Sequence, residues 1–121
     1  MGDNSLFENT WREILKHCMD KKHGYDRLTA REAMYYIGLA LMRKKQLDEA
    51  LKYFYKADEG ARVMDKESTG FMVNTNLYIG NIYDIQGKRQ LAIKQYQKLL
   101  KMKDFDGSHS KAQRYIKNAY K

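Results

Sequence analysis

The residues of this chain that could carry out chemistry are few and lie apart along the sequence. Its three histidines, His17, His23 and His109, fall in separate segments, and none has a carboxylate or cysteine at metal-ligand spacing. The single cysteine, Cys18, lies on an apolar helical face with Trp11, where an inert buried thiol is more common than a nucleophile. We therefore expect no catalytic residues, no metal site, no cofactor and no enzymatic activity.

Two short segments are similar to ligand-binding loops but lack positions that those loops require. The segment 104–107, Asp-Phe-Asp-Gly, matches the start of a calcium loop, which needs further oxygen ligands and a distal glutamate, whereas here Ser-His-Ser-Lys follows. The segment 87–89, Gly-Lys-Arg, lacks the other glycine and the hydroxyl of a phosphate-binding loop. We interpret the segment 104–107 as a turn that precedes a helix starting at Ser108.

The elements that must position these residues are predicted to be helices. The 121 residues are 43% hydrophobic and 31% charged and include no proline, a composition that favours uninterrupted helices over disorder. One cysteine forms no internal disulfide, which is usual in a reducing compartment. The apolar runs are far shorter than the ~20 residues of a membrane span, and the N-terminus has no signal-peptide pattern. We expect one cytoplasmic domain over residues 1–121, without membrane binding.

An internal repeat with a period of 42 residues organises the middle of the chain. A shift by this period aligns Tyr-Ile-Gly at 36–38 with Tyr-Ile-Gly at 78–80, and Ala50 with Ala92. In each copy, apolar residues at intervals of three and four flank a short polar turn, which predicts two amphipathic helices. A helical hairpin is therefore predicted twice.

Each copy resembles the tetratricopeptide repeat, a helical hairpin with small and aromatic residues where its helices pack. The matching repeat-packing residues are Gly38, Ala50, Phe54 and Ala57 in the first copy and Gly80, Tyr83, Ala92 and Tyr96 in the second. A mid-helix glycine costs about 1 kcal/mol relative to alanine, so we expect a neighbouring backbone to pack on it. The family's turn glycine is Gly87 in the second copy and is replaced by Lys45 in the first. The resemblance implies an all-α fold, a short right-handed α-solenoid of about six antiparallel helices.

Helix boundaries follow from the repeat and from capping patterns. The period exceeds the family's usual 34 residues by eight, which predicts a second helix about two turns longer in the first copy. Ser5 with Glu8, and Thr29 with Glu32, form capping-box patterns that predict helix starts. The expected segments are an N-terminal capping helix and linker at 3–28, a first helix pair at 29–66, a second helix pair at 69–103 and a C-terminal capping helix at 107–121.

The resemblance also implies a concave groove lined by the first helix of each pair. Its positions are Glu32, Tyr35, Leu39 and Met42 in the first copy and Asn74, Leu77, Asn81 and Asp84 in the second. We therefore expect a non-catalytic protein–protein interaction scaffold that binds a peptide or partner segment in this groove. The alternative is that these residues pack against the capping helices, which in so short an array would fill much of the groove.

The excess of positive charge lies entirely in the last third of the chain. Residues 86–121 hold ten Lys/Arg and two Asp/Glu, which accounts for the whole formal net charge of +8. The cations at helical spacing are Lys94, Lys98, Lys101, Lys111, Arg114 and Lys117. This basic face supports an alternative function, binding of nucleic acid or of an acidic partner, although an ordinary solvated face has the same pattern. A third alternative is a docking or oligomerisation appendage of a larger protein, and the sequence leaves the partner and the oligomeric state open.

Overall fold

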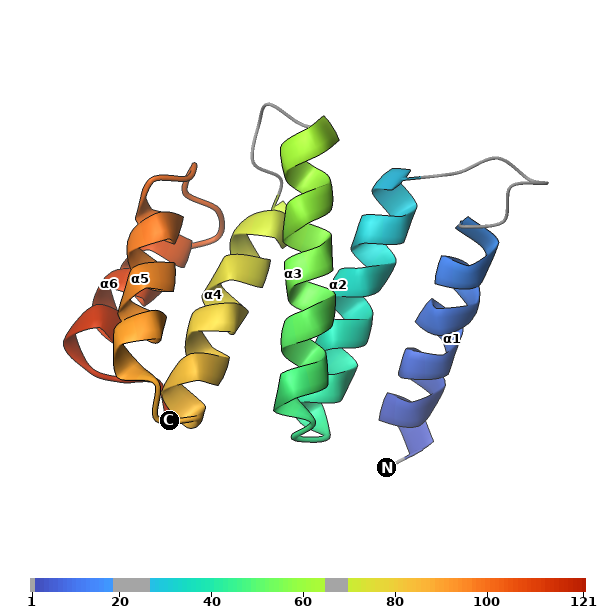
Figure 1. Ribbon diagram of the computed structural model, residues 1–121, viewed down its shortest axis with the longest axis horizontal. Helices are drawn as coiled ribbons and strands as arrows, with labels where there is room; N and C mark the ends of the chain where they lie inside the picture. Colours follow the sequence, from blue (N-terminus) through green and yellow to red (C-terminus); the bar gives the residue numbers. More distant parts are fainter. Residues whose placement is uncertain (1, 19–26, 65–69) are drawn as a thin grey trace. The chain divides into compact units, whose positions relative to one another are not determined.

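The structure, a computed structural model, describes residues 2–18, 27–64 and 70–121, and these ranges form six helices and no strand (Figure 1). The helices are α1 (Gly2–Cys18), α2 (Arg27–Arg43), α3 (Leu47–Met64), α4 (Gly70–Ile85), α5 (Arg89–Leu100) and α6 (Ser108–Lys117). The expected all-α class is confirmed for the described residues, and right-handed solenoid stacking stays a prediction. The chain divides into two compact units, residues 1–64 and residues 65–121. That the two units make one domain also stays a prediction.

In the first unit, α2 packs on both α1 and α3 (Figure 1). The buried residues come from the spaced apolar positions, and Ile37, Leu41 and Phe54 are at most 1% exposed. Rings from α1 extend this packing, because Trp11 stacks on Tyr36 with the ring centroids 4.6 Å apart. Thus α1 covers one face of α2.

In the second unit, α4 and α5 form a hairpin, and α6 packs on α5 and also contacts α4. The core cluster takes residues from all three helices: Val73, Leu77, Ala92, Tyr96, Leu99 and Ala112. The spacing of three and four along α5 places Ala92, Tyr96 and Leu99 on one side of that helix. The same amphipathic pattern that predicted the helices therefore also selects the core.

A glycine packs against an aromatic ring in each hairpin. A Cβ built at Gly38 would lie 2.7 Å from Phe54 Cε1, and one built at Gly80 would lie 2.8 Å from Tyr96 Cδ1. No side chain fits in that space, since real Cβ atoms do not approach carbon so closely. The expectation of close packing is confirmed, but the neighbour is a ring and not the backbone that was expected.

The turns that join the helices of the two hairpins have the same hydrogen bonds. Lys45 N–H donates to Met42 O at 2.9 Å, and Gly87 N–H donates to Asp84 O at 3.0 Å, one repeat period later. Both donors have left-handed backbone conformations, with φ of 62° at Lys45 and 76° at Gly87. The replacement of the turn glycine by Lys45 therefore leaves the turn unchanged, at the steric cost that a side chain has in this conformation.

The first helix starts earlier than its capping pattern predicts. It begins at Gly2, so Ser5 lies inside α1 and the expected capping box is wrong. The carboxylate of Glu8 has other partners, with Oε2 2.8 Å from Arg12 Nε and Oε1 2.6 Å from Lys44 Nζ. Two contacts to cations are stronger than one hydrogen bond from a backbone N–H, which explains why the carboxylate adopts them.

The other helix limits are partly as predicted. The second helix begins at Arg27, so Thr29 also lies inside a helix and its capping box is wrong. The second helix of the first hairpin, α3, has 18 residues against 12 in α5, which confirms the predicted extra length. The helix α6 starts at Ser108, as predicted. Its start is capped by Asp104, whose Oδ1 accepts hydrogen bonds from Ser108 Oγ at 3.1 Å and from His109 N–H at 3.0 Å.

Candidate functional site

The groove positions of the first copy lie on α2 and are mostly accessible. Glu32, Leu39 and Met42 are each partly exposed. Tyr35 is only 6% exposed, and its ring centroid lies 5.1 Å from that of Tyr36 and 6.1 Å from that of Phe54. Three of the four positions can therefore reach a partner, whereas Tyr35 belongs to the core.

The groove positions of the second copy lie on α4 and make contacts inside the second unit. Leu77 is 5% exposed and shares the core cluster with Ala112 of α6. Asn81 is 3% exposed, and the Asp84 side chain is 1% exposed. Asn74 is partly exposed. Packing against the last helix, which was the alternative interpretation of the sequence, is therefore seen at Leu77.

The carboxylate of Asp84 is the centre of a buried polar cluster. Arg89 Nη1 donates to both carboxylate oxygens, at 3.0 and 3.1 Å. The Tyr96 hydroxyl lies 2.8 Å from Asp84 Oδ2 and 3.0 Å from Asn81 Oδ1. Burial and the hydrogen bond to Asp84 raise the pKa of the Tyr96 hydroxyl, which therefore remains protonated and acts as the donor. Polar groups that the repeat register assigns to a partner are here bonded within the protein.

The same cluster binds the C-terminal residues to the α4–α5 hairpin through hydrogen bonds. Arg89 Nη2 donates to Ile116 O at 2.6 Å, near the end of α6. The Tyr120 N–H donates to the Asp84 carboxylate at 3.0 Å. The Tyr115 ring lies between two others, with its centroid 5.3 Å from that of Tyr120 and 5.7 Å from that of Tyr96. Both ends of α6 are therefore held, since Asp104 caps its start.

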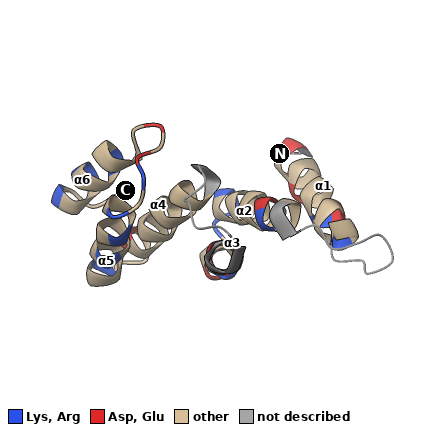
Figure 2. Cartoon of the chain, turned by 90° about the horizontal axis from the view of Figure 1, so that it is seen from above, with Lys and Arg blue, Asp and Glu red and all other residues tan. Residues whose placement is uncertain are grey.

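The predicted basic face is largely in contact with solvent. The exposed members are Lys94, Lys101, Lys111, Arg114 and Lys117, whereas Lys98 is partly buried. Figure 2 shows Lys and Arg along α5 and α6 and the acidic turn beside them. Asp104 and Asp106, the carboxylates of that turn, are exposed. Two carboxylates therefore lie beside the cations, and the surface is not uniformly basic.

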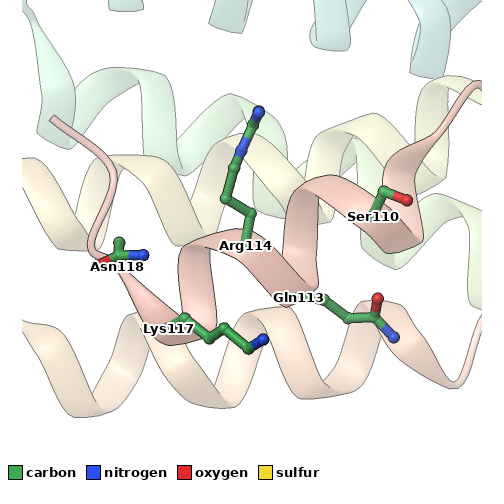
Figure 3. Close-up of a pocket in the computed structure, with 5 residues that line it drawn as sticks. All are labelled: Ser110, Gln113, Arg114, Lys117 and Asn118. Atoms are coloured by element: carbon green, nitrogen blue, oxygen red, sulfur yellow. The ribbon is translucent and has the colours of Figure 1, made fainter.

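A hollow of about 300 Å³ lies along one side of α6, and polar and cationic residues line it (Figure 3). The lining residues are Ser110, Gln113, Arg114, Lys117 and Asn118. Figure 3 shows all five along α6, with the guanidinium of Arg114 and the ammonium of Lys117 leaving the helix in different directions. The Arg114 guanidinium carbon lies 5.3 Å from the centroid of the Tyr115 ring. Hydrogen-bonding groups and two cations suit this hollow to an anionic ligand.

The sequence analysis identified the two cations of this hollow but not its amides and hydroxyl. Together with Arg114 and Lys117, these three residues recur at intervals of three and one, which marks one helix face, and this spacing was the available signal. The sequence analysis also missed Arg89 and Tyr120 as partners of a groove position. Arg89 lies only five residues after Asp84, across the hairpin turn, and this short spacing was an available signal. Tyr120 lies 36 residues after Asp84, a separation that no local pattern covers.

The described residues contain no group of three or more His, Cys, Asp and Glu that could hold a metal ion. None of the helices in the described ranges combines the length and the apolar character that a membrane span requires. Cys18 is buried and is not in a disulfide.

Fold and surfaces together define a helical protein with a duplicated hairpin and two accessible helix faces, one on α2 and one on α6. Comparisons with protein-family models, curated proteins and solved structures found no match to this chain. The resemblance to the tetratricopeptide repeat therefore rests on the repeated residues alone.

Proposed function

We propose that this chain is a non-catalytic protein-interaction scaffold of the tetratricopeptide-repeat type. The observation that supports this most directly is the repetition of one hairpin design, with the same glycine–ring packing and the same turn, one period apart. Repeated hairpins of this kind expose the same face of successive helices, and such faces hold extended partner segments.

The binding surface that we propose in the first unit is the face of α2 formed by Glu32, Leu39 and Met42. These residues are partly exposed and mainly apolar. A partner would gain affinity by covering Leu39 and Met42, because the burial of apolar side chains in an interface centre is the main source of binding energy. The Glu32 carboxylate would accept a hydrogen bond from the partner and so orient it.

The test is a binding measurement with a partner captured by chemical cross-linking to the whole chain and identified by mass spectrometry. The variant Leu39→Gln with Met42→Gln retains side-chain length and helix propensity but removes apolar surface. We expect this variant to bind the purified partner about tenfold more weakly, or worse.

The matched control is Ile85→Gln with Leu91→Gln, which also converts two apolar residues, 46% and 43% exposed, to glutamine. This control should bind the partner as the wild-type chain does. Urea midpoints confirm that both variants remain folded. Equal binding by all three proteins would disprove the α2 surface, and the lack of any protein partner would disprove the scaffold function.

The second candidate function is binding of nucleic acid or of an acidic partner by the basic face. It is favoured by the exposure of five of its six cations. Titration with single-stranded oligo-dT at increasing salt tests it, since nucleic-acid affinity falls steeply as salt rises.

A further inference from the structure

We propose that the hollow on α6 is a docking site for an acidic segment of a partner protein, in which Arg114 and Lys117 pair with carboxylates. The inference rests on the proposed scaffold function and names the partner chemistry of a surface outside the repeat groove. Its basis is the combination of a concave shape, two cations and three neutral hydrogen-bonding side chains on one helix face.

The two cations are available to a ligand. Both side chains are exposed, and among the described residues neither forms an ion pair with a carboxylate. Arg89 has a different environment, because its guanidinium is bonded to Asp84 and to Ile116 O. A carboxylate that enters the hollow therefore meets unneutralised charge.

The helix that carries the hollow is also held in place before binding. The Arg114 guanidinium lies over the Tyr115 ring, at 5.3 Å from its centroid, and that ring packs against Tyr96 and Tyr120. The Tyr120 backbone is in turn bonded to Asp84. Because α6 is fixed to the hairpin in this way, ligand binding carries no entropy cost for ordering this helix.

An acidic peptide fits the hollow better than a nucleic acid does. A backbone of phosphates needs a continuous basic track, which the exposed carboxylates of Asp104 and Asp106 interrupt just before α6, whereas a short acidic segment needs only the two cations of the hollow. A peptide can place carboxylates on Arg114 and Lys117 and use its own amides toward the hydroxyl and amides of the hollow. The volume of about 300 Å³ suits a few side chains.

The experiment measures fluorescence anisotropy of a labelled peptide of alternating Glu and Gly residues as the whole chain is added. The probe variant of the chain is Arg114→Gln with Lys117→Gln. Its matched control, the α5 variant, is Lys94→Gln with Lys101→Gln, which removes the same charge from exposed positions in α5 and at its C-cap. We expect the α6 variant to weaken binding about tenfold or more and the α5 variant to weaken it by about twofold or less.

A second variant, Ser110→Glu, places a carboxylate in the hollow and should also weaken peptide binding. The position is exposed and lies in the first turn of α6, where an acidic residue favours the helix, so folding is not compromised. Circular dichroism verifies the fold of each variant.

Three outcomes would overturn the docking site: no binding of the acidic peptide by the wild-type chain, equal weakening by the α6 and α5 variants, or tighter binding of oligo-dT than of the peptide with the same dependence on Arg114 and Lys117. The scaffold function is tested separately, because its variant changes Leu39 and Met42 on α2. If binding fails at one of these two surfaces, binding at the other can still be measured.

Discussion

Two glycines set how closely the helices of each hairpin approach. Gly38 leaves room for the Phe54 ring, and Gly80 leaves room for the Tyr96 ring. Both rings are completely buried. An apolar ring packed on a bare helix backbone stabilises the hairpin more than the glycine weakens the helix, because a buried aromatic ring removes a large area from water.

The first prediction concerns these glycines. Gly38→Ala and Gly80→Ala should each lower the free energy of unfolding by about 1–3 kcal/mol, because the added methyl overlaps a ring. The urea midpoint measures this effect. Combining Gly38→Ala with Phe54→Leu should cost less than the sum of the two single changes, since the smaller side chain makes room. A higher midpoint for Gly38→Ala would contradict the packing at Gly38.

The second prediction concerns the left-handed residues of the turns. Lys45→Gly should raise the free energy of unfolding by about 0.5–1 kcal/mol, and Gly87→Lys should lower it by about 1 kcal/mol, because only glycine adopts positive φ without steric cost. Thermal unfolding of the two variants provides the comparison. The same sign for both changes would show that the turns differ.

At the scale of the elements, α1 is attached to the end of α2 through Glu8. Burial acts to raise the pKa of the Glu8 carboxyl, but hydrogen bonds from Lys44 and Arg12 and the charges of both outweigh it, so its pKa is lowered. Arg12 also donates to the Tyr53 hydroxyl of α3 at 2.9 Å. The carboxylate thus joins α1 to the hairpin of the first unit.

The third prediction follows from that carboxylate. Glu8→Gln should lower the free energy of unfolding by about 1–2 kcal/mol at neutral pH, as the loss of hydrogen bonds to a charged group does. Because the pKa is lowered in the folded state, the contribution is complete above the unfolded value of 4.5 and is lost as pH falls through the folded pKa. Urea midpoints of the wild type and Glu8→Gln should therefore converge in acid. A constant difference at all pH values would exclude the ion pairs as its cause.

The fourth prediction concerns the attachment of α6. Asp84→Asn should lower the free energy of unfolding by about 3 kcal/mol, because the guanidinium of Arg89 loses its carboxylate in a largely buried place. Amide hydrogen exchange should accelerate in α6 and at Tyr120 more than in α1 to α3. The control is Asp106→Asn, the same change at an exposed turn position, which should leave exchange unaltered. Uniform acceleration in the whole chain would refute this local role.

At the scale of the whole molecule, the excess positive charge lies in one part of the chain. Residues 86–121 carry the entire net charge of +8, a value that already includes the two carboxylates of the turn before α6, and Asp84 neutralises Arg89 locally. The affinity of an acidic ligand should depend differently on salt if it binds the whole basic face than if it binds one pair of cations. Each cation that the ligand neutralises adds to the number of counterions released.

The fifth prediction applies this difference. If Arg114 and Lys117 alone hold an acidic peptide, the logarithm of its affinity should fall with the logarithm of salt concentration with a slope of about −2 or shallower. Anisotropy titrations at several salt concentrations measure the slope. A much steeper slope would mean that the entire basic face takes part.

The sequence by itself determined the helical class, the duplicated hairpin, the longer α3 and the turn before α6, because each follows from spacing and turn chemistry within a short segment. It also selected Gly38 and Gly80 as close-packing positions, although not the rings that fill them. The two capping boxes were wrong, since both helices begin earlier than Ser5 and Thr29, and Glu8 pairs with Arg12 and Lys44 instead.

Only the tertiary structure decided what happens beside α4. The repeat register treats Leu77, Asn81 and Asp84 as groove positions, but all three have partners within the second unit. Leu77 packs with Ala112 of α6, Asn81 accepts a hydrogen bond from Tyr96 of α5, and Asp84 accepts one from the Tyr120 N–H. The repeat register predicts which residues share a helix face, whereas the element that packs on this face depends on how α6 folds back over the hairpin. Periodicity along one helix reports which residues face the same way; which group they meet is set by long-range packing, which no spacing in the sequence encodes.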